Sequence, residues 1–349
     1  MLSARTGTIL KQLVEQYIDK AVPVPSMSLA RKSVLRLSPA TIRNEMACLE
    51  QEGYIFRPHT SAGSIPSDKG YRYYVESLRD VTLSPAEQRL ISHLFHKVER
   101  EIDGWLSLAA TLMAQLAQNV AIVSLPRPVA SKFKHIELVA LQGSLVLTVV
   151  VLSGVKVKEK LITFDGAIAQ SELSRMANKL NAAYSGISRK QLLAKEVELS
   201  DIEKLIRNHL AKMMQAEDDQ EYEETLLDGL HFILNQPEFA RSDQMKPLME
   251  LVEYRKLLKC IVPKGLMEYG TQVVIGKENR DEAIHNYSVV ISHYGLPDEA
   301  TGTIGVVGPT RMHYARTIST VNYISLVLSE LMAGLYGRKI PAREKGSSN

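Results

Sequence analysis

Apolar side chains recur every third or fourth position through the first fifty residues, which predicts amphipathic helices rather than strands. The spacing predicts a first helix over residues 6–20, and the two prolines in the sequence VPVPS end it. A short second helix then begins at Ser26, and a third begins at Ser38 and ends near Gly53. One apolar stripe runs along this third helix and comprises Ile42, Met46 and Leu49.

The opposite face of the third helix carries small and polar residues and no bulky apolar group. Arg43 can read guanine and Asn44 can read adenine through paired hydrogen bonds in a DNA major groove. We therefore predict base readout by Arg43 and Asn44, with Ser38 and Thr41 near phosphates at the start of the helix. The alternative is an ordinary solvated helix face. The face comprises Ala40, Arg43, Asn44 and Ala47, with Thr41 at its edge.

A short basic hairpin is predicted directly after the third helix, with Gly63 at its turn. Three helices followed by a hairpin predict a winged helix-turn-helix, in which the third helix reads the groove and the wing touches the DNA backbone. Backbone contacts raise affinity without reading sequence, and they release counterions. We expect such contacts from four wing residues, Arg57, His59, Thr60 and Ser61.

Downstream, the pattern alternates between helical and strand-like segments. Ser84 and Pro85 start a long predicted helix, whose apolar stripe runs from Ile91 to Leu116 and includes Trp105 as a core residue. Runs rich in β-branched residues, separated by two-residue glycine turns, then predict an antiparallel meander over residues 136–141, 145–152 and 155–164. Further helices are predicted over residues 170–183 and 201–234, further strands over 271–276, 287–294 and 302–307, and a final helix over 321–335.

The order of these segments predicts an α+β fold. Strands, then a helical block, then strands again favour an antiparallel sheet domain into which a helical segment of residues 196–250 is inserted. The winged helix-turn-helix over residues 1–80 precedes this domain.

Charge is unevenly distributed along the 349 residues. The chain has 42 Lys and Arg against 39 Asp and Glu, a net charge of +3, and residues 1–80 carry eleven against eight. The basic excess therefore belongs to the N-terminal part, as expected for a nucleic-acid-binding module on a neutral body. Cys48 and Cys260 show no metal-binding spacing, and neither a signal peptide nor a membrane-spanning run is predicted. We expect a cytoplasmic protein that associates with the nucleoid when bound to DNA and contacts no membrane.

Few residues offer other chemistry. His93 and His96 lie one helical turn apart without a suitably spaced carboxylate or thiol, so we expect a solvated pair instead of a metal site. The acidic run Glu217–Glu224 is likewise expected to be solvated. Gly308–Pro309 lacks the spacing of a phosphate loop, which favours a tight turn, although Arg311 keeps an anion site open. Because no nucleophile motif is present, we predict no enzymatic activity, and no cofactor or metal.

Several motifs together resemble the HrcA family of heat-inducible transcription repressors. SPATIRNEMACLEQEGYI, RPHTSAG and IPSDKGYRYYV fall within residues 1–80, and IGKEN and GTIGVVGPTRMHYAR fall within about 270–320. The resemblance implies a repressor of chaperone operons that binds, as a homodimer, an inverted-repeat operator in double-stranded DNA. It also implies a GAF-like domain over 85–195 and 251–340, interrupted by the dimerising insertion at 196–250, and activity maintained by a GroEL-type chaperonin. Apolar strands such as LVLTVVVL would expose, on partial unfolding, a surface that a chaperonin binds.

Two residues depart from the family pattern. Pro25 stands where the family usually has glycine, before the second helix, and Ser64 stands where it usually has arginine, at the expected wing tip. Ser64→Arg is accordingly expected to tighten DNA binding. A second hypothesis stays open, namely a metabolite-responsive winged-helix transcription factor with a ligand in the GAF-like domain near Arg311. The residues do not determine the operator sequence, the ligand or the dimer geometry.

Overall fold

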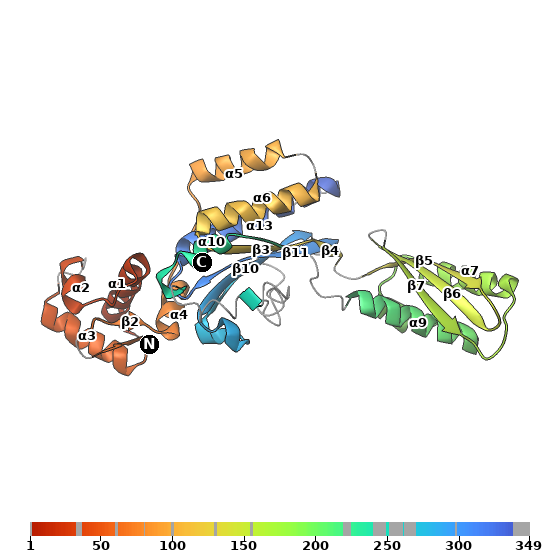
Figure 1. The fold of residues 1–349 in the computed structure, drawn as a ribbon, viewed down its shortest axis with the longest axis horizontal. Helices are drawn as coiled ribbons and strands as arrows, with labels where there is room; N and C mark the ends of the chain where they lie inside the picture. Colours follow the sequence, from red (N-terminus) through yellow and green to blue (C-terminus); the bar gives the residue numbers. More distant parts are fainter. Residues whose placement is uncertain are drawn as a thin grey trace. The chain divides into compact units, whose positions relative to one another are not determined.

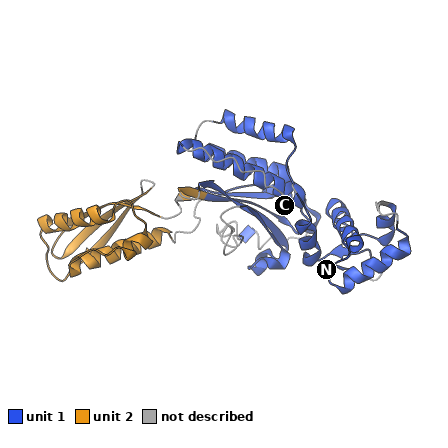
Figure 2. Cartoon of the chain, turned by 180° about the vertical axis from the view of Figure 1, so that it is seen from behind, with its two compact units in different colours: residues 1–126, 224–296, 302–349 blue, residues 127–223, 297–301 orange. Residues whose placement is uncertain are grey.

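The structure of the chain is a computed structural model. It forms two compact units (Figure 2), one made of Met1–Pro126, Glu224–Leu296 and Gly302–Asn349 and the other of Arg127–Glu223 and Pro297–Thr301. The structure describes residues 2–32, 37–59, 62–79, 81–98, 101–128, 131–153, 156–218, 225–239, 249–250, 261, 270–296 and 299–337.

The first unit begins with three helices and a hairpin, in the order that the sequence predicts (Figure 1). Strands β1 and β2 pair antiparallel, and a fourth helix follows them directly. Serine side chains cap three of these helices at their starts, because each accepts a backbone N–H of the first turn. The elements are α1 (Ala4–Lys20), α2 (Ser26–Lys32), α3 (Pro39–Gln51), β1 (Ile55–Phe56), β2 (Ile65–Pro66) and α4 (Asp68–Glu76).

The rest of the first unit is an antiparallel sheet covered by helices. Its strand order is β8 (Thr225–Asp228), β3 (Val120–Ser124), β11 (Ala300–Pro309), β10 (Tyr287–Leu296) and β9 (Thr271–Ile275). The short strand β4 (Arg127–Pro128) belongs to the second unit and pairs with Thr301 and Ala300, the two residues of β11 that also belong to that unit. Helices α6 (Ile102–Ala117) and α13 (Tyr314–Leu335) pack against this sheet, and α5 (Pro85–Lys97) lies on the outer side of α6 (Figure 1). Trp105 of α6 is buried, as the sequence predicts.

Helix α13 is long and apolar enough to cross a membrane by length and composition alone. Half of its most apolar window is buried inside the fold, where it packs against β10 and α6. Val321, Ile324 and Leu328 lie in the core of the unit. The apolar character of α13 is therefore that of a core helix.

The second unit has a sheet and a core of its own. Strands β5 (Phe133–Ala140), β6 (Leu145–Leu152) and β7 (Lys156–Thr163) pair antiparallel in chain order, as the predicted meander requires. Gly143, in the turn between β5 and β6, has φ +65°, a left-handed conformation that favours glycine. Helices α7 (Gln170–Tyr184), α8 (Arg189–Ala194) and α9 (Asp201–Asp218) bury one face of the sheet, in a core that includes Phe133, Ile136, Val150, Leu173, Leu180, Ile206 and Leu210.

The compact units do not follow the boundaries expected from the sequence. The expected insertion was a helical segment of residues 196–250, whereas the second unit covers 127–223 and contains the meander. Strand β8 and helix α10 (Leu230–Leu234) fall within the expected insertion but belong to the first unit, where β8 pairs with β3. The boundaries differ because β5, β6 and β7 pack with α7 and α9 around a hydrophobic core of their own.

The long helix predicted from Ser84 is in fact two helices, α5 and α6. Val98 is extended at the end of α5, and Gly104 of α6 packs so closely against it that an added Cβ would lie 2.8 Å from the Val98 side chain. Both helices bury an apolar face. Apolar residues therefore recur at helical spacing on both sides of the break, so their periodicity in the sequence does not reveal that the helix ends there.

The helix predicted over residues 201–234 is not one helix, since α9 covers its first half and α10 covers only its last five residues. Helix α9 ends at Asp218, residues 219–224 lie outside the described residues, and 225–228 form strand β8. Glu217, the first residue of the acidic run, is buried and pairs with Lys158 at 2.8 Å, so this end of the run is not solvated.

Candidate nucleic-acid interface

Helix α3 buries the apolar stripe that the sequence predicts. Ile42, Met46 and Leu49 are at most 3% exposed. The Ser38 hydroxyl oxygen accepts a hydrogen bond from the backbone N–H of Thr41 at 3.1 Å and so caps the helix. These contacts fix the inner face and the start of α3, and its opposite face lies in solvent.

The solvent face of α3 brings the predicted groove-reading residues together. Ala40, Arg43, Asn44 and Ala47 are exposed, and Thr41 is partly exposed at the edge. Within the described chain, the side chains of Arg43 and Asn44 make no hydrogen bond or ion pair. The guanidinium and the amide are therefore available for an external partner. The hydroxyls of Ser38 and Thr41 lie 2.9 Å apart at the helix start.

The hairpin contributes two described residues of the predicted set, Arg57 and His59, and both are exposed. The Arg57 Nε lies 3.3 Å from the Glu50 carboxylate, and about a third of each side chain remains solvent-accessible. Solvated ion pairs of this kind are weak, so Glu50 does not compete strongly with a phosphate for Arg57. Thr60 and Ser61 lie outside the described residues.

Ser64 does not lie exposed at the tip of the hairpin, so the position expected for it is wrong. It is fully buried and exchanges two backbone hydrogen bonds with Val24, of 2.8 and 3.0 Å. A Cβ on the neighbouring Gly63 would overlap with the backbone of Val24, so the two segments are in close contact. An arginine at position 64 would bury a charge against this turn instead of reaching DNA.

Glu45 is a residue of α3 that sequence reasoning missed. It lies on the inner side of the helix, where the Thr6 hydroxyl donates to one carboxylate oxygen at 2.7 Å and the Arg5 Nε donates to the other at 2.7 Å. The hydrogen bond from Thr6, followed by that from Arg5, holds the pKa of this carboxyl below its usual value, against the opposing effect of burial. Glu45 therefore ties α3 to α1.

We expect Glu45→Gln to lower the free energy of opening of α3 by about 1–2 kcal/mol at neutral pH, because charge-assisted hydrogen bonds are lost. The folded-state pKa lies below the unfolded-state value, so this stabilisation is present above the unfolded-state pKa and is lost as the pH falls through the folded-state pKa. Hydrogen exchange of the α3 amides, compared between wild type and variant at the same pH, measures the difference. The difference should stay constant from about pH 7 to about pH 5 and shrink as the pH falls below about 4.

The matched control is Glu50→Gln, which removes a carboxylate from the exposed side of the same helix. Its effect on α3 opening should stay within about 0.5 kcal/mol. Equal effects of the two variants would show that Glu45 has no special role in holding α3.

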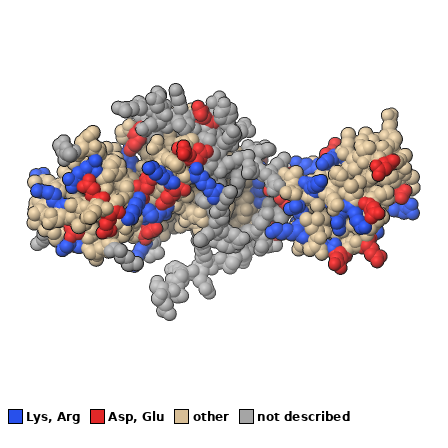
Figure 3. Space-filling model, turned by 90° about the horizontal axis from the view of Figure 1, so that it is seen from below, with Lys and Arg blue, Asp and Glu red and all other residues tan. Residues whose placement is uncertain are grey.

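Charge of both signs covers the N-terminal part of the chain. In the view of Figure 3, Lys and Arg are interspersed with Asp and Glu there. On the face that this view shows, Lys and Arg do not form one continuous basic patch.

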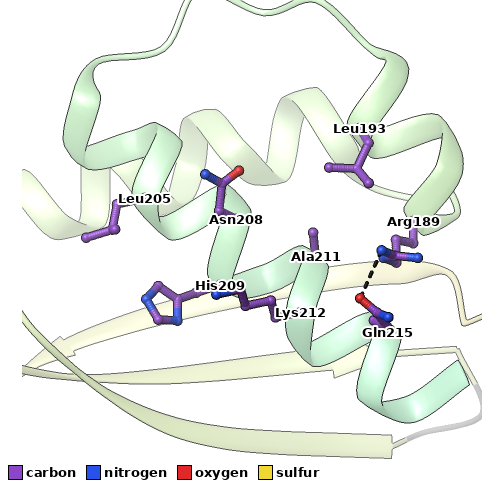
Figure 4. A pocket seen from close by; sticks show the side chains of 8 residues that line it. All are labelled: Arg189, Leu193, Leu205, Asn208, His209, Ala211, Lys212 and Gln215. Carbon is purple, nitrogen blue, oxygen red and sulfur yellow. Dashed lines mark hydrogen bonds between the residues drawn. The ribbon is translucent and has the colours of Figure 1, made fainter. Parts of the chain in front are cut away.

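A hollow of about 380 Å³ lies beside helices α8 and α9 of the second unit (Figure 4). Arg189 donates to the Gln215 side chain at 2.9 Å at one end, and His209 lies at the other. Burial, followed by the charges of Lys160 and Lys212, lowers the pKa of His209. These polar groups do not converge on a common point, and the hollow is not assigned a ligand.

Comparison with known proteins identifies the family. A family model described as the HrcA protein C terminal domain matches residues 103–318. A protein of Dehalococcoides mccartyi named heat-inducible transcription repressor HrcA is 51% identical to this chain, and the match covers 97% of this chain and 98% of the relative. A protein of the same name from Herpetosiphon aurantiacus is 40% identical, and the match covers 98% of this chain and 99% of the relative. The chain belongs to the HrcA family. A crystal structure of a protein titled hypothetical shares the fold, with 24% identity, a TM-score of 0.56, and coverage of 95% of this chain and 98% of that one.

The HrcA motif GTIGVVGPTRMHYAR forms β11 and the start of α13, and it does not form an open phosphate loop. The Arg311 guanidinium donates to the Ile18 carbonyl oxygen at 3.1 Å and to the Gln236 side chain at 3.4 Å, and it pairs with Glu238. These partners engage three of its nitrogens. The anion site that the sequence left open at Arg311 is therefore occupied by groups of the protein itself.

The Nδ1–H of His96 donates to the Ser92 carbonyl oxygen of its own helix at 2.7 Å. In the part of this HrcA-family chain that the structure describes, no three or more His, Cys, Asp or Glu side chains gather as a metal site would require.

Proposed function

We propose that this chain is a heat-inducible transcription repressor that binds double-stranded DNA through helix α3. The observation that carries the proposal is the exposed face of α3 in a member of the HrcA family, where Arg43 and Asn44 are both available. The order of three helices and a hairpin matches a winged helix-turn-helix, whose third helix enters the major groove. Arg43 would read guanine and Asn44 would read adenine. A repressor of this kind acts on the nucleoid in the cytoplasm.

The remaining contacts proposed for the interface position the protein on the DNA backbone. Ser38 and Thr41 lie at the exposed start of α3, where a helix N-terminus favours phosphate. Arg57 and His59 would reach phosphates from the hairpin, and we propose the same role for Thr60 and Ser61. These contacts add affinity without reading sequence.

An inverted-repeat operator needs a two-fold protein, so we propose that the chain acts as a homodimer. The outer face of the β5–β6–β7 sheet supports the second unit as the contact. Val139, Leu147 and Leu161 lie side by side across the three strands, and Val151 and Val157 form a second apolar pair. Helices bury the other face of this sheet, whereas Val139, Val157 and Leu161 are exposed.

Two glutamates divide this outer face, because Glu137, Val149 and Glu159 form the row between the two apolar ones. In a dimer with a two-fold axis, the apolar rows of one copy would pack against the apolar rows of the other. The glutamates of the two copies would then occupy equivalent positions in the contact. We therefore place the dimer contact on this sheet and not on the helical segment 196–250 that the sequence favoured.

Cys48 offers a direct test of the DNA-binding face. It is exposed on α3, one turn after Asn44, and the only other cysteine of the sequence is Cys260. In a Cys260→Ser variant, a thiol-reactive maleimide should label Cys48 quickly in the free protein. A DNA duplex selected by the protein from a random-sequence library should slow the labelling in proportion to the bound fraction, because the groove covers this face.

The control carries its thiol in the second unit. Ser171 is exposed on α7, and Ser171→Cys combined with Cys48→Ser and Cys260→Ser should be labelled at the same rate with and without the duplex. Binding of the duplex with no protection of Cys48 would remove α3 from the interface and overturn the proposal.

We propose further that a GroEL-type chaperonin maintains the DNA-binding conformer. The support is the partly exposed apolar face of β6, which partial unfolding would uncover further. On heating, other clients would occupy the chaperonin and the repressor would leave its operator. The engagement of Arg311 by protein groups weighs against the alternative, a metabolite bound near that residue.

Protection of Cys48 also separates these two regulators. Chaperonin added to the purified protein and duplex should raise the protected fraction without any metabolite. If chaperonin has no effect and a dialysable cell extract raises protection, the protein is metabolite-responsive.

A further inference from the structure

A set of contacts within the first unit joins the hairpin-following helix α4 to the body of the unit. Its two sides lie about 200 positions or more apart in the chain, and the residues of the body come from the two motifs IGKEN and GTIGVVGPTRMHYAR. We call this set the seam. It comprises Asp68, Tyr71 and Arg72 of α4, the Ile18 carbonyl of α1, and Gly276, Lys277, Glu278, Arg311 and Tyr314 of the body.

The contact at Gly276 requires glycine on two grounds. Its φ is +52°, and an added Cβ would overlap with both carboxylate oxygens of Asp68. The next backbone N–H, that of Lys277, donates to Asp68 at 3.0 Å. The close approach of the two segments is therefore built into the backbone.

Arg72 makes the most directional contact of the seam. Its Nε donates to Glu278 at 2.9 Å, and its Nη2 donates to Glu278 and to the Val273 carbonyl oxygen, the latter at 2.7 Å. Glu278 also accepts from the backbone N–H of Ile275 at 2.8 Å, which fixes the carboxylate. A guanidinium held by a fixed carboxylate and a carbonyl defines an orientation as well as an attraction.

Buried tyrosines and a helix end complete the seam. The rings of Tyr71 and Tyr314 lie 5.9 Å apart, and both residues are almost fully buried. Arg311 donates to Ile18, one of the last carbonyl groups of α1, which has no partner within the helix. The seam therefore holds both α4 and the end of α1.

Two hydrogen bonds join α4 to the C-terminal end of α3, the proposed reading helix. Ser67, the N-cap of α4, donates its hydroxyl to the Gly53 carbonyl at 2.7 Å, and Lys69 donates to the Glu52 carbonyl at 2.8 Å. Both carbonyls lie at the C-terminal end of α3. A rotation of α4 on the body would therefore carry α3 with it.

We infer that the seam sets the half-site spacing that the repressor accepts. In a two-fold dimer, the angle between each reading helix and its body is one of the terms that set the distance between the two reading helices, so a change of this angle changes that distance. Arg72 and Glu278 are positioning residues that act through α4, and they touch no DNA. The inference rests on the proposed function, since it requires a dimer on an inverted repeat.

The test uses the full chain and duplexes that carry the inverted repeat selected by the wild-type protein, with the spacer lengthened or shortened by single base pairs. Wild type should prefer one spacer by about tenfold or more. Glu278→Gln, at a residue more than a third exposed in its side chain, and Gly276→Ala should each flatten this preference to about twofold or less. Their affinity for an isolated half-site should stay at the wild-type value.

Asp201→Asn is the matched control, because it breaks an exposed ion pair with Lys204 away from the seam. It should keep the wild-type spacer preference. Should Glu278→Gln keep that preference, or lower affinity equally for every spacer and for the half-site, the inference is overturned. The proposed function is tested separately by the wild type, which must select an inverted repeat at all. If it selects none, both the proposed function and this inference fall.

Discussion

Arg43→Ala is expected to weaken binding to the selected operator by about 1–3 kcal/mol, roughly 5- to 150-fold in Kd. The side chain is exposed on α3 and is free of partners within the described chain, so its truncation removes a contact to DNA without breaking one inside the protein. The loss should also be specific to one operator position. Titration of operators mutated one base pair at a time measures this, because the variant should no longer distinguish bases at the position that Arg43 reads.

Two control variants separate readout from charge. Arg57→Ala, on the hairpin, should weaken all duplexes by a similar factor and reduce the salt slope by about one. Arg175→Ala removes an exposed charge from α7 in the second unit and should leave binding unchanged. If Arg43→Ala keeps the full wild-type base preference, Arg43 does not read the operator.

The N-terminal elements could be predicted from the sequence because local signals agree there. The Ser38 cap, the stripe of Ile42, Met46 and Leu49 and the exposed face of α3 all follow from helical periodicity. Glu45 could not be found in this way. Its partners, Thr6 and Arg5, lie about 40 residues earlier, and periodicity does not show which polar residue faces a neighbouring helix.

The elements that the sequence analysis misplaced or missed depend on contacts between residues far apart in the chain. Strand β3 was not predicted, because the run Val120–Ser124 follows α6 without a turn signal, yet it pairs with both β8 and β11. Ser64 could be located only from its pairing with Val24. Nothing local shows that residues 133–163 close a core apart from β9–β11, because the apolar pattern of a strand does not show which helices will cover it.

The glycine motif around Arg311 shows the same limit in a functional residue. From the sequence, a glycine-rich turn before a helix with a nearby arginine keeps an anion site open. In the fold, Ile18, Gln236 and Glu238 engage that arginine. The motif IGKEN likewise has a docking role, with Gly276 against Asp68. The residues of these two motifs therefore serve contacts inside the protein.

Leu147→Glu is expected to convert the dimer to monomers. Leu147 lies on the central strand of the second unit, between Val139 and Leu161 in the register, so a carboxylate there would be buried in the proposed contact. Loss of the dimer removes the gain from binding two half-sites together, which lowers the affinity for the full inverted repeat by about 100-fold or more. Affinity for an isolated half-site should not change. Sedimentation and operator titration measure the two effects.

Leu193→Glu provides the matched control, since Leu193 is an exposed leucine of the same unit that lies on α8, beside the hollow and off the outer sheet face. The control should remain a dimer and bind the full operator as the wild type does. The opposite result, a dimer that survives Leu147→Glu and is lost in Leu193→Glu, would move the contact to the helical side of the unit. That side includes α9, which lies within the segment 196–250 favoured by the sequence. The pair of variants therefore decides between the sheet and the helices, because each adds one carboxylate at a leucine of the same unit.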